Sequence, residues 1–206
     1  SNMIGQKKSS GVYKIFGIQY AQYVKGEADF TYTRNFNTRN SLAMHVGAGI
    51  AYPYGNSSMV PFEKRFYAGG ANGWGVRTLG PGAFDARNSV TDFINQCGDI
   101  RLDLSIEYRA KLFWVLEGAL FVDAGNIWTI KDYPNQPGGQ FKFDKFYKQI
   151  AAAYGLGLRM DFTYFLLRLD LGFKAYNPAM NQERWPIVHP RWGRDANFHF
   201  AVGYPF

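Results

Sequence analysis

Apolar and polar residues alternate along much of the chain, with the two-residue period of a β-strand that has two unlike faces. The clearest example is Asp99–Arg109, in which every even-numbered residue is apolar and every odd-numbered residue is polar or charged. Similar but often less regular alternation is present in 12–24, 29–33, 42–52, 114–126, 154–162, 165–174 and 197–206. The pattern predicts an all-β chain of about eight antiparallel strands.

Two-faced strands occur in soluble β-sandwiches and in membrane β-barrels, and the details of these strands favour a membrane barrel. Several of them reach the roughly 9 to 11 residues that a tilted transmembrane strand needs. Their apolar faces are large and aromatic, as lipid contact requires, whereas their polar faces carry the charges and glycines of a hydrated lumen. We expect Trp114, Leu116, Leu120, Leu167, Leu169, Phe198 and Phe200 to face lipid or detergent, and Arg101, Asp103, Arg159, Arg168 and Asp170 to face the other way.

The connections between the predicted strands alternate in length. Long connections lie near 55–97, 127–148 and 177–195, and short ones lie near 37–40, 111 and 163. All the long connections therefore fall on one side of the sheet. Because outer-membrane barrels have short periplasmic turns and long external loops, the sequence predicts a location in the bacterial outer membrane.

The composition narrows the possible partners and cofactors. Hydrophobic residues make up 47% of the 206 residues, yet no run is long and apolar enough for a membrane helix. The net charge of +7 comes from basic residues scattered among acidic ones, so we expect no nucleic-acid partner. The single cysteine, Cys97, excludes an internal disulfide framework and a clustered thiolate metal site, and we expect no cofactor.

The sequence gives little support to an enzyme. Neither His45, His189 nor His199 lies in a metal-ligand spacing, and no serine lies in a nucleophile-elbow context. Glu117 and Asp123 would lie roughly 20 Å apart along one strand, which is too far for a glycosidase pair. We therefore expect no catalytic residues. A passive porin or receptor barrel is the nearer alternative function, and an outer-membrane hydrolase is the more remote one.

The stretch Pro61–Gly82 is glycine-rich, yet it is too aromatic for a solvent loop or a disordered linker. Its glycines allow tight turns and close approach to other surfaces. Its aromatic residues, together with Arg65 and Arg77, need an enclosed partner. We therefore expect this stretch to fold into another part of the molecule.

Several motifs together resemble one protein family. Phe121–Trp128 contains an F-x-D-x-G motif similar to that of the BamA/TamA superfamily, also called the surface-antigen family, of outer-membrane assembly and secretion factors. The glycine-rich stretch resembles the long external loop that folds back into the barrel in this family, and Gly98–Arg109 resembles the strand that follows that loop. The alternating residues Phe198, Phe200, Tyr204 and Phe206 resemble the C-terminal assembly signal of the family. Leu79–Gly82 is similar to Bacteroidetes members.

This resemblance implies how the chain is organised. Family barrels have sixteen strands and follow periplasmic POTRA domains, so we expect residues 4–206 to be the C-terminal half of such a barrel, without its POTRA domains. Residues 1–3 resemble a remnant of tag removal, and 55–97 would be the long external loop. A half-sheet has exposed edges, so we expect a closed eight-stranded barrel or a homodimer of half-barrels.

The resemblance also implies a function and a site. The function is insertion or translocation of client outer-membrane proteins or envelope components, through a barrel seam at the last strand, 196–206. In the family, an arginine at the loop tip binds acids in the lumen. Gly73 and Trp74 match the tip, Asn72 stands where the arginine is expected, and Arg77 is the candidate cation. Its partners would be Asp123 first and Glu117 second. In the alternative, Asp123 caps local backbone and Arg77 is solvated.

Overall fold

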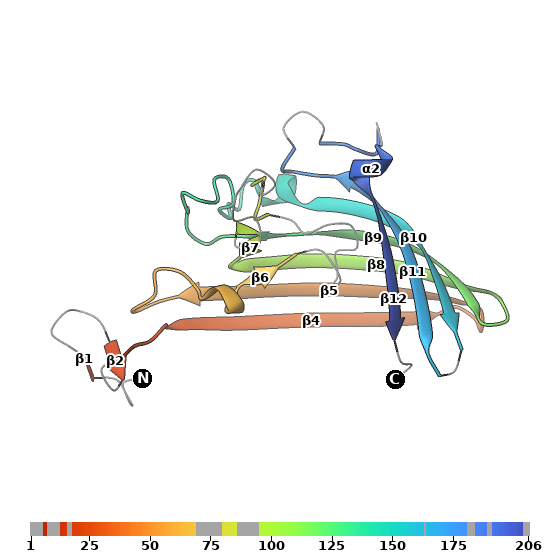
Figure 1. Cartoon of the computed structure of the whole chain (residues 1–206), viewed down its shortest axis with the longest axis horizontal. Coiled ribbons are helices and arrows are strands. Elements are labelled where there is room, and N and C mark those ends of the chain that lie inside the picture. Colours follow the sequence, from red (N-terminus) through yellow and green to blue (C-terminus); the bar gives the residue numbers. More distant parts are fainter. Residues whose placement is uncertain are drawn as a thin grey trace.

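In the computed structural model, residues 6–7, 13–15, 18–68, 80–85, 95–162, 164–180, 184–188 and 191–203 are described. Their main element is an antiparallel sheet of seven strands in the order β12-β11-β10-β9-β8-β5-β4 (Figure 1). The strands are β4 (Tyr23–Asn35), β5 (Asn40–Pro53), β8 (Ile100–Phe113), β9 (Leu116–Trp128), β10 (Ala151–Asp161), β11 (Leu166–Tyr176) and β12 (Ala196–Gly203). The seven long strands are neighbours in the sheet in the order in which they occur in the chain, which is the topology of an up-and-down barrel wall.

Short elements accompany the wall. Strands β1 (Gln6–Lys7), β2 (Tyr13–Ile15) and β3 (Ile18–Gln19) form a small sheet, and β6 (Phe66–Tyr67) pairs with β7 (Cys97–Gly98). The helical turns are η1 (Phe62–Lys64), η4 (Phe146–Gln149) and α2 (Trp192–Asp195). No helix among the described residues has the length and apolar character needed to cross a membrane.

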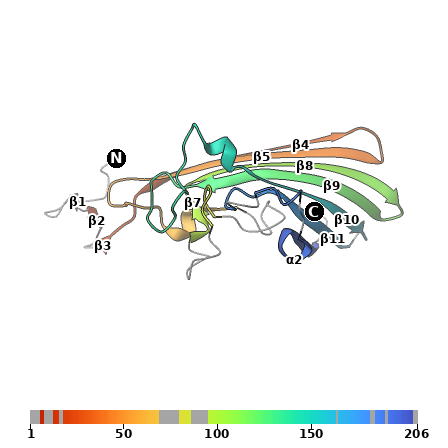
Figure 2. The ribbon, with the colours of Figure 1, turned by 90° about the horizontal axis from the view of Figure 1, so that it is seen from above.

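The two faces of the wall have the polarity that the alternation predicts. On the convex face, Leu120, Phe198 and Phe200 are exposed by 54%, 66% and 60%. On the concave face, Arg159 and Asp170 are each exposed by only 6%. The strand pairing places the other predicted residues on the same two faces. Leu116, Leu167 and Leu169 lie on the apolar face, and Arg101, Asp103 and Arg168 lie on the polar face. The curved wall of a membrane barrel is therefore confirmed (Figure 2).

Trp114 does not belong to this apolar face as predicted. Strand β9 begins at Leu116, and Trp114 lies in the tight turn after β8 with a φ of 52°. The short connection forces one residue into the left-handed region, and alternation ends there. The indole is 89% exposed and makes an edge-on contact with Phe162, with the ring centroids 6.3 Å apart. Phe162 in turn stacks on Phe165, with the ring centroids 4.8 Å apart.

The N-terminal part of the sheet also differs from the prediction. The predicted strands 12–24 and 29–33 are replaced by the short β2 and β3 and by one 13-residue strand, β4. Gly26 and Ala28 occupy apolar-face positions between Val24 and Phe30. Because these two residues are small, they interrupt the hydrophobic pattern while the backbone alternation continues. Among the described residues the wall therefore has seven long strands, close to the predicted number of about eight.

The sheet is open. Strands β4 and β12 stand at its two ends and each pairs with one neighbour among the described residues. Nearly every residue of β4 is exposed, as expected of an edge without a partner. The predicted closed eight-stranded barrel is therefore wrong for the described part of this chain, because no eighth long strand bridges the two edges. Pairing of the edges with a second copy, or with the rest of a longer barrel, stays a prediction.

Candidate loop-anchoring site

The concave face carries paired charges along the length of the wall. Arg159 on β10 binds both carboxylate oxygens of Glu107 on β8, with the Nη2–Oε2 distance at 2.5 Å. Arg168 and Asp170 pair on β11. Nearer the loops, the Nε2 atom of His45 lies 3.2 Å from a carboxylate oxygen of Asp103. Such pairing lowers the cost of placing many charges inside a narrow barrel lumen.

The F-x-D-x-G motif has a structural explanation in this wall. Phe121, Asp123 and Gly125 are spaced by two, so all three lie on the concave face of β9. The Phe121 ring lies against Gly155 on β10, where a side chain would collide with it. A Cβ atom on Gly125 would lie 2.5 Å from the carbonyl oxygen of Leu102 on β8. The two glycines thus allow the strands to approach closely around the motif.

Asp123 lies nearly buried on the concave face of β9. It is 6% exposed and accepts a hydrogen bond from the Ser105 hydroxyl of the adjacent strand. It also lines a cavity of about 440 Å³ on the concave face. His45, Arg168 and His199 line the same cavity, so its walls come from both ends of the sheet as well as from its middle.

Glu117 lies at the other end of β9, near the short turns. Its side chain is 29% exposed, and one of its carboxylate oxygens lies 4.0 Å from the Lys111 ammonium group. Arg159 stands directly opposite Glu117 in the pairing of β9 with β10. The structure therefore separates the two predicted acids into different surroundings.

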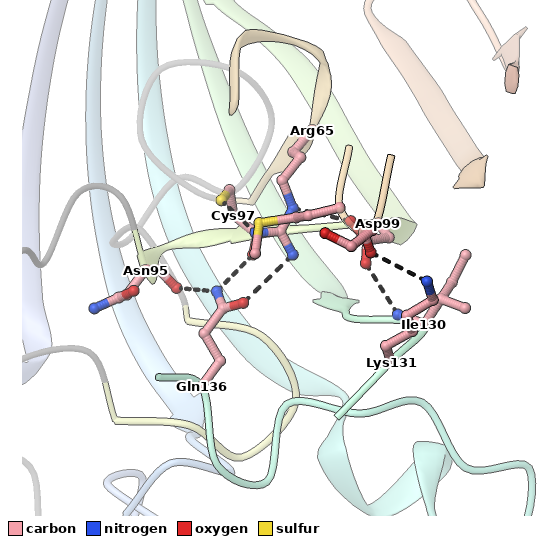
Figure 3. A network of polar contacts seen from close by, with 9 residues as sticks. Arg65, Asn95, Cys97, Asp99, Ile130, Lys131 and Gln136 are labelled. Carbon is pink, nitrogen blue, oxygen red and sulfur yellow. Dashed lines mark hydrogen bonds and ion pairs between the residues drawn. The ribbon is translucent and has the colours of Figure 1, made fainter. Parts of the chain in front are cut away.

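Among the described residues, the most enclosed ion pair lies at the loop end of the wall. The Arg65 Nε atom donates to Asp99 Oδ1 at 2.9 Å, and the two side chains are exposed by only 3% and 0% (Figure 3). Asp99 also accepts the backbone N–H of Ile130 at 3.1 Å. The Arg65 guanidinium lies over the Tyr133 ring at 5.3 Å. Arg65 lies near the start of the glycine-rich stretch and Asp99 follows the predicted loop 55–97, so this pair joins segments near the two ends of that loop.

Gln136 connects a third segment to this pair. Its side-chain oxygen accepts from Arg65 at 3.3 Å, and its nitrogen donates to the carbonyl oxygens of Asn95 and Cys97 at 2.7 and 2.9 Å (Figure 3). Gln136 is fully buried. Its three hydrogen-bond partners, Arg65, Asn95 and Cys97, all lie in other segments of the chain. We call Arg65, Asn95, Cys97, Asp99 and Gln136 the neck network.

Burial controls the protonation of the groups around the neck network, all of which lie outside the long strands. Burial raises the pKa of the Cys97 thiol, and the nearby Arg65 opposes this only in part. Burial and the neighbouring Asp99 carboxylate raise the pKa of Tyr133 to about 12. Both groups are therefore neutral at physiological pH, and Arg65 and Asp99 supply the charges of the network.

Phe66 fixes the start of the glycine-rich stretch against the wall. Its side chain is 4% exposed and packs with Ala51, Val60 and Ile127 at the loop end of the concave face. A Cβ atom on Gly49 would lie 2.5 Å from the Phe66 ring, so that ring occupies the space that a side chain would fill. The chain therefore enters the barrel mouth immediately before the glycine-rich residues.

The far end of the same stretch is bound to the end of β9. The Gly82 N–H donates to the Ile127 carbonyl at 2.7 Å, and the Asn126 side chain donates to the Gly82 carbonyl at 2.8 Å. Gly82 has a φ of 57°, and a Cβ atom there would lie 2.6 Å from the Gly138 carbonyl oxygen. Only glycine combines that backbone conformation with so close a contact.

Five of the predicted site residues lie outside the described residues, namely Gly73, Trp74, Arg77, Tyr204 and Phe206. Among the described ones, Phe198 and Phe200 lie on the convex face of β12. Asp123 and Glu117 lie on the concave face, as predicted from the alternation. The contact between Arg77 and Asp123 stays a prediction.

Sequence reasoning missed the partner of Arg65. It recognised that this arginine needs an enclosed partner, but it assigned Asp99 to the first polar position of an alternating strand. The available signal was that Asp99 precedes the strand β8 and follows the sequence Cys97–Gly98, so it lies where the wall meets the loops. Gln136 carried no signal, because a glutamine in a long connection is typical of a solvated loop.

Comparisons with known proteins agree with this architecture. The Omp85 superfamily domain matches residues 9–206. The chain is similar to the outer membrane protein assembly factor BamA of Neisseria meningitidis serogroup B, with 29% identity over 124 residues, 54% of this chain and 15% of that protein. Its fold matches the crystal structure of BamA from Haemophilus ducreyi lacking POTRA domains 1-3, with a TM-score of 0.62, 17% identity, and coverage of 93% of this chain and 36% of that chain.

The chain thus spans 15% of the length of the curated relative and 36% of the solved chain. The matches confirm the resemblance to the BamA/TamA superfamily and the location in the outer membrane. They do not test the similarity of Leu79–Gly82 to Bacteroidetes sequences, which stays a prediction. Because the superfamily domain covers residues 9–206, the chain belongs to the Omp85 superfamily.

Proposed function

We propose that this chain is the C-terminal part of a non-enzymatic outer-membrane barrel that inserts or translocates client outer-membrane proteins. Membership of the Omp85 superfamily supports the class of function, since both relatives are BamA proteins and one is named as an outer membrane protein assembly factor. The observation that carries the proposal is the place of the last described strand, β12, at a free edge of the sheet.

A free strand edge can act as a template. β12 pairs with β11 through residues Ala196 to Gly203, so the backbone groups of its other edge have no strand partner among the described residues. Unpaired backbone groups cannot remain exposed in lipid, because no water is present to bind them. A client strand added to this edge would satisfy them by β-augmentation. The apolar side chains of Phe198 and Phe200 already provide the lipid-facing surface next to such a strand.

The loop-anchoring role of Asp123 is part of this proposal. An arginine and a carboxylate form two parallel charge-assisted hydrogen bonds, which hold a loop more firmly than a lysine would. The burial of Asp123 beside the concave cavity supports a lumenal partner of this kind, with Arg77 as the cation. The neck network then holds both ends of the same loop at the barrel mouth.

Depletion of the intact protein in cells tests the function. We expect other outer-membrane barrels to accumulate in an unfolded form, measured by their electrophoretic mobility with and without heating. The porin alternative predicts that client folding is unchanged and that only solute uptake falls. Undiminished client folding after complete depletion would contradict the proposal.

A double-mutant cycle tests the anchor, with Arg77→Ala, Asp123→Ala and both changes scored by client assembly. We expect each single variant to lose as much client assembly as the double variant, because either substitution removes the whole Arg77–Asp123 contact. Additive losses would show that the pair does not exist. Asp170→Asn is a matched control, since Asp170 is equally buried on the same face but pairs with Arg168.

A further inference from the structure

The connection between β9 and β10 covers part of the convex face, on the lipid side of the wall. Trp128 lies on the face opposite Ile127, which packs in the concave cluster, yet Trp128 is fully buried. Phe141 and Phe146 cover it edge-on, with ring centroids 5.5 and 6.4 Å from its own. The Trp128 Nε1 atom donates to the Gln149 side chain at 2.8 Å. Segment 141–149 is therefore fixed to the outside of the barrel, at its loop end.

Three lysines recur at every third residue of this segment. The Lys145 N–H donates to the Lys142 carbonyl and the Lys148 N–H donates to the Lys145 carbonyl, both at 3.0 Å. The first bond closes a turn over 143–145, and the second leads into the 3₁₀ turn η4, so the lysines recur at every third residue of a tightly turned segment. All three lysines are exposed. We call Lys142, Lys145 and Lys148 the lysine row.

Exposed aromatic rings accompany the lysine row. Phe143 is 85% exposed and Tyr147 is 57% exposed, although Phe143 also contacts Phe141 at a centroid distance of 5.0 Å. Asp144 is the one acidic residue in the segment. Within the part of the chain that the structure describes, no carboxylate forms an ion pair with the lysine row. Closely spaced cations beside exposed rings, on the lipid side of a barrel and at its rim, match the boundary between acyl chains and phosphate headgroups.

We propose that segment 141–149 is a binding surface for the phosphate groups of outer-leaflet lipids. The lysine row binds phosphate oxygens, and Phe143 and Tyr147 enter the adjoining acyl region. The occupant is a phosphorylated lipid rather than free phosphate, because the rings offer an apolar contact that an inorganic anion cannot use. This surface is independent of the seam strand and of the loop anchor.

Lipid titration of the intact protein in a neutral detergent, followed by native mass spectrometry, tests this site. The probe is lipid A, a glycolipid with two phosphate groups, and phosphatidylcholine is the reference lipid. Replacing the lysine row together, with Lys142→Gln, Lys145→Gln and Lys148→Gln, should weaken lipid A binding at least tenfold, since each lysine near an anionic surface contributes about fivefold. The corresponding arginine variant should retain binding. Phosphatidylcholine binding should not change.

The matched control removes three exposed lysines elsewhere, with Lys14→Gln, Lys64→Gln and Lys111→Gln. Heat-dependent mobility on gels first establishes that each variant is folded. Equal lipid A binding by the wild type and the lysine-row variant would overturn the proposal, and so would an equal loss in the control. Displacement of lipid A by an equal concentration of inorganic phosphate would also overturn it, since the site would then be a simple anion site.

Discussion

The wall and the neck network are organised by different kinds of interaction. In the wall, charged side chains on the concave face pair with neighbours on the same strand or up to two strands away, and several of these pairs are partly exposed, such as Arg101 with Asp103 at 22% and 30%. In the neck network, Arg65 and Asp99 are 34 positions apart and almost completely buried. The wall therefore depends on a repeated pattern, whereas the neck depends on a few particular residues.

This difference determines how each region responds to mutation. An exposed ion pair gains little, because water screens it and both side chains lose conformational entropy. A buried charge whose partner is removed remains desolvated and unpaired, which is strongly destabilising. The neck should therefore be sensitive to single substitutions that the wall tolerates, and four predictions test this contrast.

The largest effect should come from breaking the buried pair. Arg65→Met and Asp99→Asn should each lower the free energy of unfolding by about 3 to 5 kcal/mol, because each leaves one buried charge without its partner. Urea titration of the protein in lipid vesicles, followed by electrophoretic mobility, measures this loss. Glu27→Gln is the control, since Glu27 pairs with Lys25 at the exposed edge and should cost less than about 1 kcal/mol. Equal losses at the two sites would remove the distinction between wall and neck.

The same contrast explains what could be predicted from the sequence. The wall was predictable because two-residue alternation reports directly which face of a strand a residue occupies, as for Leu169 and Asp170. Alternation was a weaker guide where small residues interrupted it, at Gly26 and Ala28, and where a turn ended it, at Trp114.

The neck was not predictable because no local pattern encodes it. Gln136 binds Arg65 across 71 positions, and its other contacts are to the carbonyl groups of Asn95 and Cys97. Such contacts depend on how the long connections fold over the barrel mouth. The F-x-D-x-G motif marked Asp123 as a candidate anchor, but the enclosed pair that the structure describes is formed by Arg65 and Asp99.

A second prediction tests the lipid-facing side of the wall. Leu169→Arg should lower the free energy of unfolding by about 2 to 4 kcal/mol, because a charge near the middle of the bilayer loses its hydration. Leu169→Phe is the control and should cost much less, since the ring is apolar. The measurement is the same urea titration in vesicles. A small effect of the arginine would mean that Leu169 does not contact lipid.

A third prediction concerns Gly82, where the glycine-rich stretch returns to the wall. Gly82→Ala should cost about 1 to 3 kcal/mol, because its φ of 57° is strained for alanine and its Cβ would meet the Gly138 carbonyl oxygen. Gly138→Ala separates the two causes, since Gly138 has a φ of 80° but nothing within 4 Å of a new Cβ. We expect the Gly138 variant to lose less stability. Equal losses would assign the whole effect to backbone strain.

The smallest expected effect is the pH dependence that Tyr133 gives to the neck. Burial raises the pKa of Tyr133 from 10.0 to about 12, so its neutral form is favoured in the folded protein. The resulting stability is fully present below pH 10 and is lost as the pH rises through 12. By pH 11 the loss should be on the order of 1 kcal/mol relative to neutral pH. Comparing urea titrations of the wild type and Tyr133→Phe across this range isolates the contribution, because other alkaline titrations are common to both proteins. The wild type should lose more stability than the variant between pH 9 and 12, and parallel curves would show that Tyr133 titrates alike in the folded and unfolded chains.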